Sequence, residues 1–245
     1  MSGHSKWSTI KHKKGKTDAQ RGKIFTKIGR EIAVAVKEGG SDPVANSKLR
    51  DAIAKAKAVN MPNDNIERSI KKAAGELNAI NFEEITYEGY GAGGIAVICE
   101  ALTDSRNRTA SDVRHVFDRF GGNLGSSGCV SYMFDRLGIL IIDASGKKAD
   151  DVMMDALEAG ADNFEEIDGV FEITCDPTAF SPVREALGAK YAFASAAIEW
   201  VPQNTTAPEG ENLERFLKLI DWLEDLDDVQ AVYHAAELPE EPEDD

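Results

Sequence analysis

The spacing of apolar residues changes near residue 76, and this change constrains the fold more than any other feature of the sequence. Before it, apolar residues recur every three or four positions in three segments, at about 22–37, 43–59 and from 64 onward, which predicts three amphipathic helices. After it, short apolar runs and glycine-rich turns alternate with helical segments. The predicted fold class is therefore α+β, with a three-helix N-terminal domain followed by two α+β domains.

Residues that favour helix starts set the limits of the second and third helices. Asp42 followed by Pro43 has the pattern of an N-cap with proline at the first helical position. Asp64 lies three residues before Glu67, the spacing of a capping box. Each helix is expected to bury one apolar face and to present a basic exterior. On the second and third helices this exterior contains Lys48, Arg50, Lys55, Lys57, Arg68, Lys71 and Lys72.

Residues 138–201 contain predicted elements in the order β-α-β-β-α-β, which is the ferredoxin-like order. The predicted strands are 138–143, 163–167, 170–175 and 193–201, and the predicted helices lie near 149–159 and 179–189. This segment is therefore expected to form a compact α+β domain of its own.

The segments on both sides of this unit are predicted to form one middle domain. They comprise strands at 84–89, 95–103 and 129–134 with a helix at 107–120, and later a helix at 211–225 with a strand at 229–234. Because the last helix and strand have no domain of their own, we expect them to complete the middle domain, with the ferredoxin-like domain inserted into it. The predicted domain limits are 1–75, 76–135 with 205–236, and 136–204 for the insertion, followed by an acidic tail at 237–245.

Charge is divided unequally between the two parts of the chain. Residues 1–75 contain 17 Lys and Arg against 7 Asp and Glu, a net charge of +10. The remaining residues contain 11 Lys and Arg against 36 Asp and Glu, a net charge of −25. At physiological salt, charges are screened beyond about 8 Å, so a phosphate on the basic part would hardly sense the acidic remainder. The basic part is therefore predicted to bind nucleic acid.

The candidate phosphate-binding residues lie on a flexible arm, residues 1–22, and on the first helix. On the arm they are Lys6, Lys11, Lys13, Lys14, Lys16 and Arg21, and on the helix they are Lys23, Lys27 and Arg30. Trp7 lies within the arm, where it could either stack on a base or dock onto the three-helix core.

A second cluster of basic residues lies near the start of the predicted helix at 107–120. Arg106 and Arg108 are candidates for a further phosphate contact, since the free amides of a helix N-terminus also favour an anion. Asp104, Asp112 and Asp118 nearly balance the arginines of this segment, so ion pairs within the helix are an equal alternative.

No motif predicts catalysis or a cofactor. The run from Gly89 to Gly94 matches G-x-G-x-x-G, but a strand follows it directly, so a hairpin turn is predicted instead of a dinucleotide site. The four His and three Cys residues have no metal-ligand spacing, and no nucleophile motif occurs. The chain is therefore expected to be non-enzymatic, with no cofactor, metal or small-molecule substrate.

The sequence also predicts a cytoplasmic location. The longest aliphatic run, residues 139–142, is far shorter than the roughly 20 apolar residues that cross a bilayer. The first fifteen residues are polar and basic, without the apolar region of a signal peptide. The odd number of cysteines predicts no disulfide framework, as is typical of a reducing compartment. No membrane partner is expected.

Several short motifs resemble those of the YebC family. They are Gly3-His-Ser-Lys-Trp7, Arg21-Gly-Lys-Ile-Phe-Thr-Lys27, Tyr87-Glu-Gly-Tyr-Gly91, Asn107-Arg-Thr109, Gly121-Gly-Asn-Leu-Gly125 and the segment from Leu226 to His234. The resemblance extends over essentially the whole chain. It implies a three-domain α+β protein with a helical N-terminal domain. Members are described as cytoplasmic DNA-binding transcriptional regulators, and the family includes the mitochondrial translational activator of cytochrome c oxidase and members linked to relief of ribosome stalling.

Two functions therefore remain open at the level of sequence. One is a DNA-binding transcriptional regulator, and the other is a ribosome-associated translation factor that binds ribosomal RNA or tRNA and relieves stalled elongation. A basic arm and basic helices suit both partners, because both present closely spaced phosphates. The helices show no recognition-helix pattern for reading bases. A metabolic enzyme in the α+β domains is a third, remote possibility.

Overall fold

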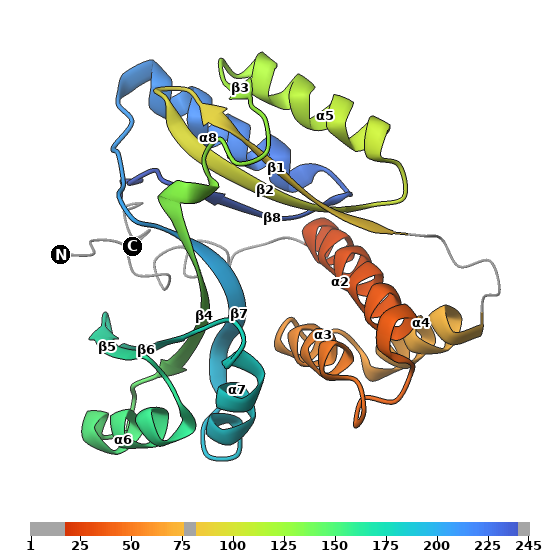
Figure 1. Ribbon diagram of the computed structural model, residues 1–245, viewed down its shortest axis with the longest axis vertical. Coiled ribbons are helices and arrows are strands. Elements are labelled where there is room, and N and C mark those ends of the chain that lie inside the picture. Colours follow the sequence, from red (N-terminus) through yellow and green to blue (C-terminus); the bar gives the residue numbers. More distant parts are fainter. Residues whose placement is uncertain (1–17, 76–81, 240–245) are drawn as a thin grey trace. The chain divides into compact units, whose positions relative to one another are not determined.

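The computed structural model describes residues 18–75 and 82–239 (Figure 1). The described residues form two compact units, one of residues 18–135 with 202–239 and one of residues 136–201. The arm candidates Lys6, Trp7, Lys11, Lys13, Lys14 and Lys16 lie outside the described residues, as does the end of the acidic tail.

The first unit begins with three helices, α2 (Asp18–Gly39), α3 (Ser47–Ala58) and α4 (Asn63–Gly75). Helix α2 packs against both of the others. Their shared core contains Ile28, Ile32, Leu49, Ala56 and Ile66, all almost completely buried. These residues carry the three-to-four-residue spacing of the sequence, so the three predicted helices are confirmed.

The start of α3 differs from the prediction. Its N-cap is Asn46 and not Asp42: the Asn46 Oδ1 accepts a hydrogen bond from the Leu49 N–H at 3.1 Å. The Asn46 amide also donates to the Ala35 carbonyl at 2.7 Å and the Gly40 carbonyl at 2.8 Å. One buried side chain therefore caps α3 and also satisfies carbonyls at the end of α2. The Asp42 side chain accepts a hydrogen bond from the Val44 N–H, in the turn that precedes α3.

The third helix also begins earlier than predicted. It starts at Asn63, so Asp64 lies inside the first turn instead of capping it. An acidic residue there still favours the helix, because it faces the positive end of the helix dipole.

A four-stranded sheet follows in the same unit, with the strand order β3-β1-β2-β8. Strands β1 (Glu83–Gly91) and β2 (Ile95–Thr103) form an antiparallel hairpin in which Gly91 pairs with Ile95. The turn contains Gly93 and Gly94, both at positive φ, a conformation that favours glycine. The predicted hairpin turn is confirmed.

The other two strands of this sheet come from later in the chain. The two-residue strand β3 (Asn123–Leu124), which the sequence did not predict, pairs with β1. Strand β8 (Val229–His234) is antiparallel to β2. Helices α5 (Arg106–Arg119) and α8 (Gly210–Asp225) contact each other and pack on the same face of the sheet (Figure 1). The C-terminal strand β8 thus joins the same sheet as β1 and β2, and the C-terminal helix α8 packs on that sheet.

The predicted strand at 129–134 was wrong. Residues Ser131–Met133 form a short 3-10 helix, η1, and the next strand begins only at Phe134. The reason is the buried carboxylate of Glu88, which accepts hydrogen bonds from the backbone N–H groups of Gly128, Val130 and Ser131. Because those N–H groups donate to one carboxylate, they are not available to a neighbouring strand.

The second unit contains a four-stranded sheet with the order β5-β6-β4-β7. Its elements are β4 (Phe134–Asp143), α6 (Ala149–Ala159), β5 (Asn163–Ile167), β6 (Val170–Cys175), α7 (Phe180–Gly188) and β7 (Phe193–Pro202). Strand β6 is antiparallel to both β4 and β5, so β4 and β5 are parallel with β6 between them. This is the split β-α-β arrangement of ferredoxin-like domains. The α+β class is confirmed, whereas the exact limits of the three domains stay a prediction.

Candidate nucleic-acid interface

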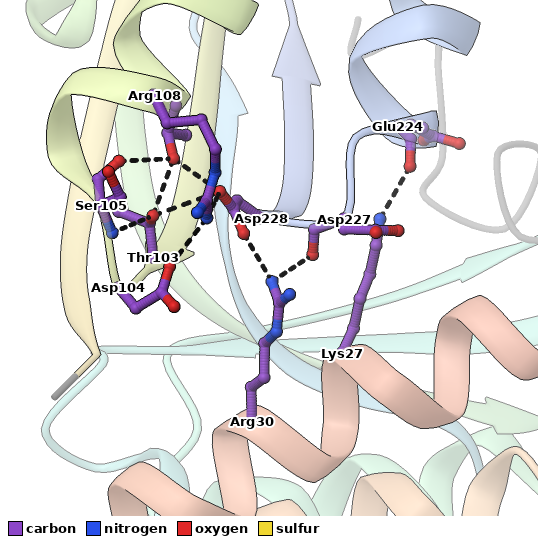
Figure 2. Close-up of polar contacts among 10 residues, drawn as sticks. Lys27, Arg30, Thr103, Asp104, Ser105, Arg108, Glu224, Asp227 and Asp228 are labelled. Atoms are coloured by element: carbon purple, nitrogen blue, oxygen red, sulfur yellow. Dashed lines mark hydrogen bonds and ion pairs between the residues drawn. The ribbon is translucent and has the colours of Figure 1, made fainter. Parts of the chain in front are cut away.

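The cationic face of α2, formed by Lys23, Lys27 and Arg30, makes ion pairs and hydrogen bonds with residues 224–228. These are the last two residues of α8 and the turn before β8, and we call them the α8–β8 turn. The Lys23 Nζ lies 3.0 Å from the Asp225 Oδ1. The Lys27 Nζ donates to the Glu224 carbonyl at 2.7 Å. Arg30 contacts the same turn, and Figure 2 shows Lys27 and Arg30 pointing toward it.

Arg30 makes the innermost contacts of this face. Its Nη1 donates to the Asp227 carbonyl at 2.6 Å and to the Asp228 Oδ1 at 2.8 Å. The Lys27 contact is favourable for a further reason, because the Glu224 carbonyl lies at the C-terminal end of α8, where the helix dipole is negative. In this structure the cationic face of α2 therefore already binds the anionic and polar acceptors of the α8–β8 turn.

Asp228 is the centre of the junction, with a side chain that is only 9% exposed. Its Oδ2 accepts hydrogen bonds from the Thr109 hydroxyl at 2.6 Å, the Arg108 Nη2 at 2.7 Å and the Thr103 hydroxyl at 3.2 Å (Figure 2). Burial alone would raise the pKa of Asp228. The hydrogen bonds from Thr109 and Arg108, with the charges of Arg108 and Arg30, outweigh burial and hold the pKa below its ordinary value.

The two candidates at the start of α5 have different surroundings. Arg108 lies between Asp104, at 2.8 Å, and Asp228, and these hydrogen bonds raise the pKa of its guanidinium. Arg106 is exposed and lies 3.3 Å from the Glu83 carboxylate. Both arginines thus form ion pairs with residues outside α5, Arg108 with Asp104 and Asp228 and Arg106 with Glu83. Their role in phosphate binding stays a prediction.

A second cationic surface lies on α3 and α4. Residues 47–75 contain seven Lys and Arg against three Asp and Glu. On α3, Lys48 lies 2.6 Å from Glu38, and Lys55 lies 2.6 Å from Glu31. On α4, an open groove is lined by Arg68, Lys71 and Lys72, together with Asp64 and Glu67. We call Arg68, Lys71 and Lys72, all of them exposed, the α4 basic face.

Sequence reasoning missed the partners of α2. Asp225 and Asp228 were not candidates, although the Asp227-Asp228 pair lies within the motif from Leu226 to His234. A pair of acidic residues directly before an apolar strand was the available signal, but it does not show what the carboxylates bind. Of the predicted residues, the structure brings together Lys23, Lys27, Arg30 and Arg108, and it places Arg106 beside Glu83. Arg21 was predicted on the flexible arm, but α2 begins at Asp18, so Arg21 lies on this helix, where it is exposed.

The Glu88 carboxylate organises the glycine-rich loop before η1. It is buried, and it accepts from Gly128 at 2.8 Å, Val130 at 2.9 Å and Ser131 at 2.8 Å. Burial pushes the pKa of Glu88 upward, but these backbone donors outweigh burial and lower it. The loop is thus held by one ionised side chain.

We expect Glu88→Ala to lower the free energy of unfolding by about 2–3 kcal/mol, because three backbone donors lose a charged acceptor. Glu84→Ala, an exposed change on the same strand, is the control and is expected to stay within about 0.5 kcal/mol. Urea denaturation measures the energies, and amide hydrogen exchange should accelerate at Gly128, Val130 and Ser131. Unchanged exchange at these three amides would show that another group holds the loop.

Residues 18–75 and 82–239 contain no group of three or more His, Cys, Asp or Glu residues placed to bind a metal ion. None of their helices combines the length and apolar character needed to cross a membrane.

The fold and the charge distribution define a class of protein, an α+β chain whose helical N-terminal module has a basic exterior. Comparison with known proteins identifies the family. Residues 5–76 match the model of the TACO1/YebC protein N-terminal domain, and residues 82–236 match the model of the TACO1/YebC second and third domain. The chain belongs to the TACO1/YebC family.

Individual relatives match over nearly their whole length. A protein of Acetivibrio thermocellus named "probable transcriptional regulatory protein" is 62% identical, with 96% of this chain and 98% of that protein covered. One of the same name from Ruminiclostridium cellulolyticum is 59% identical, with 99% of each chain covered. The crystal structure of a conserved hypothetical protein from Aquifex aeolicus has a TM-score of 0.84 and 47% identity, and covers 98% of this chain and 100% of that chain.

Proposed function

We propose that this protein is a non-enzymatic regulator of transcription that binds duplex DNA through its phosphate backbone. The observation that carries the proposal is the α4 basic face, where Arg68, Lys71 and Lys72 are exposed and share one side of a helix. The arm adds five lysines with no acidic residue among positions 1–17. The names of the relatives, probable transcriptional regulatory proteins, are consistent with this role.

Contacts of this kind bind DNA with little dependence on base sequence. Lysine and arginine neutralise phosphates and release counterions, which supplies affinity but does not read bases. Specific promoter choice would then depend on DNA shape or on protein partners. We further propose that the protein acts in the cytoplasm, where its three cysteines, none of them in a disulfide, remain reduced.

The proposal is tested by measuring the binding of the full chain to a duplex of about 20 base pairs as salt is varied. Fluorescence anisotropy should show log K falling linearly with log salt, by about 0.9 for each phosphate contact. A structured RNA of equal charge is measured beside the duplex. In cells, crosslinking to chromosomal DNA supports the transcriptional role, whereas co-sedimentation with ribosomes and no DNA crosslinking would assign the protein to translation. No binding to the duplex at low salt would refute the proposal.

Deletion of residues 2–16 tests the arm separately, because it removes Lys6, Lys11, Lys13, Lys14 and Lys16 but leaves α2 intact. We expect weaker binding to DNA and RNA alike, and a salt dependence that is flatter by up to about 4 to 5 in slope. Replacing the same segment by an uncharged linker of equal length controls for length. An unchanged slope would show that the arm makes no phosphate contacts.

A further inference from the structure

The cationic face of α2 has the composition of a phosphate-binding surface, yet the α8–β8 turn covers it. Lys23, Lys27 and Arg30 recur at intervals of four and three residues, so they form one row along the helix. The acceptors that they meet are two carboxylates and two peptide carbonyls of the α8–β8 turn, at 2.6–3.0 Å. Figure 2 shows the contacts of Lys27 and Arg30. Phosphate oxygens are acceptors of the same kind.

We propose that the α8–β8 turn is a built-in competitor that covers a second polyanion-binding surface, formed by Lys23, Lys27 and Arg30, which nucleic acid uncovers by displacing the turn. This inference rests on the proposed function and adds to it a covered surface and its regulation. The turn stands in the place of the phosphate backbone, and the affinity of the whole protein depends on whether the turn is bound or released.

The contacts at the Lys23 end of the row are more exposed to solvent, and therefore weaker, than those at the Arg30 end. At the outer end, the side chains of Lys23 and Asp225 are 43% and 70% exposed, and an exposed ion pair of this kind contributes little. At the inner end, those of Arg30 and Asp228 are 20% and 9% exposed. A polyanion can therefore replace Asp225 first and then advance along the row toward Arg30.

Release of α2 does not leave the central carboxylate without partners. Asp228 keeps its hydrogen bonds from Arg108 and Thr109 on α5 and from Thr103 on β2, none of which belongs to α2. The carbonyls of Glu224 and Asp227 would pass to water. The junction can therefore open without the large penalty of an unpaired buried charge, as a reversible contact requires.

A matched pair of variants in one turn isolates the effect. Asp225→Lys places a cation opposite Lys23 and should release the outer end of the row. Asp227→Lys makes the same change of charge two residues away, where the contact to α2 is a backbone carbonyl. Both variants attract DNA equally through general charge, so only the difference between them reports uncovering of α2.

We expect Asp225→Lys to bind the 20-base-pair duplex roughly 10-fold more tightly than Asp227→Lys at about 0.1 M salt, with a salt dependence steeper by about 1 to 2. Adding Lys23→Gln and Lys27→Gln should abolish this gain, but in the wild-type chain the same two changes should alter affinity less than 2-fold. Should Asp225→Lys melt at a lower temperature than Asp227→Lys, the milder pair Asp225→Asn and Asp227→Asn replaces them, with a smaller gain expected.

The possible results separate this proposal from the proposed function. Equal affinity of the two lysine variants would overturn the competitor role but leave DNA binding intact. The competitor role would also be overturned if Lys23→Gln and Lys27→Gln lowered duplex affinity as much in the wild-type chain as in the Asp225→Lys chain. In that case the three cations would already be accessible to DNA in the wild-type chain. Absence of binding by every variant at low salt would overturn both proposals.

Discussion

Replacing Asp228 by alanine is expected to lower the free energy of unfolding by about 2–4 kcal/mol, because a buried carboxylate that accepts several hydrogen bonds, two of them from arginines, is lost. The carboxylate is shared by Arg30 and Arg108 and also accepts from Thr109. The variant therefore removes the acceptor that these three groups share, although Arg108 keeps Asp104 and Arg30 keeps the Asp227 carbonyl. Urea denaturation followed by circular dichroism measures the loss.

The neighbouring residue supplies the control for this experiment. Asp227 accepts the hydrogen bond from Arg30 with its backbone carbonyl, which alanine keeps. Asp227→Ala should therefore change the free energy of unfolding by less than about 0.5 kcal/mol. Because the chain has two compact units, only the transition of the unit that contains Asp228 should shift, while that of residues 136–201 should stay in place. Equal losses in the two variants would show that the Asp228 carboxylate is not the centre of the junction.

The same carboxylate should make stability depend on pH in the acid range. The pKa of Asp228 is lower in the folded protein than its ordinary value of 3.8, so its contribution is complete above that value and is lost as pH falls through the lowered pKa. Asp228→Asn removes this titration. The stability difference between wild type and variant should therefore shrink below about pH 4, and a constant difference down to pH 2 would contradict the assignment.

Neutralising the α4 basic face by Arg68→Gln, Lys71→Gln and Lys72→Gln is expected to weaken duplex binding by up to about 500-fold at 0.1 M salt. Each lost phosphate contact removes about 0.9 from the salt slope, so three contacts account for about 2.7. The three side chains are exposed, and the ion pair of Lys71 with Glu67 is long and exposed to solvent, so stability should hardly change.

The control for this prediction lies on the adjacent helix. Lys48→Gln and Lys55→Gln remove cations that the structure already pairs with Glu38 and Glu31 at 2.6 Å. These changes should reduce affinity much less for each charge removed. A salt slope that is the same in wild type and the α4 variant would mean that DNA is bound elsewhere on the chain.

Local sequence patterns were sufficient for most of the elements. The limits of β2, α6, β5, β6 and β8 agree with the predicted residues, because the spacing of buried side chains and the flanking glycines are properties of short segments. The errors fall where a distant group intervenes. Asn46 outcompetes Asp42 as the cap because its amide reaches carbonyls at the end of α2, and Glu88 takes the N–H groups of the predicted strand at 129–134.

For the candidate site, the sequence by itself determined which charges each helix carries: the row on α2 and the α4 basic face follow from residue type and helical spacing. Only the tertiary structure decided that the α2 row faces the α8–β8 turn, about 200 residues later in the chain. The physical reason is that helix periodicity depends on neighbours three or four positions apart, whereas the partner of a charge depends on how the three helices and the sheet pack together.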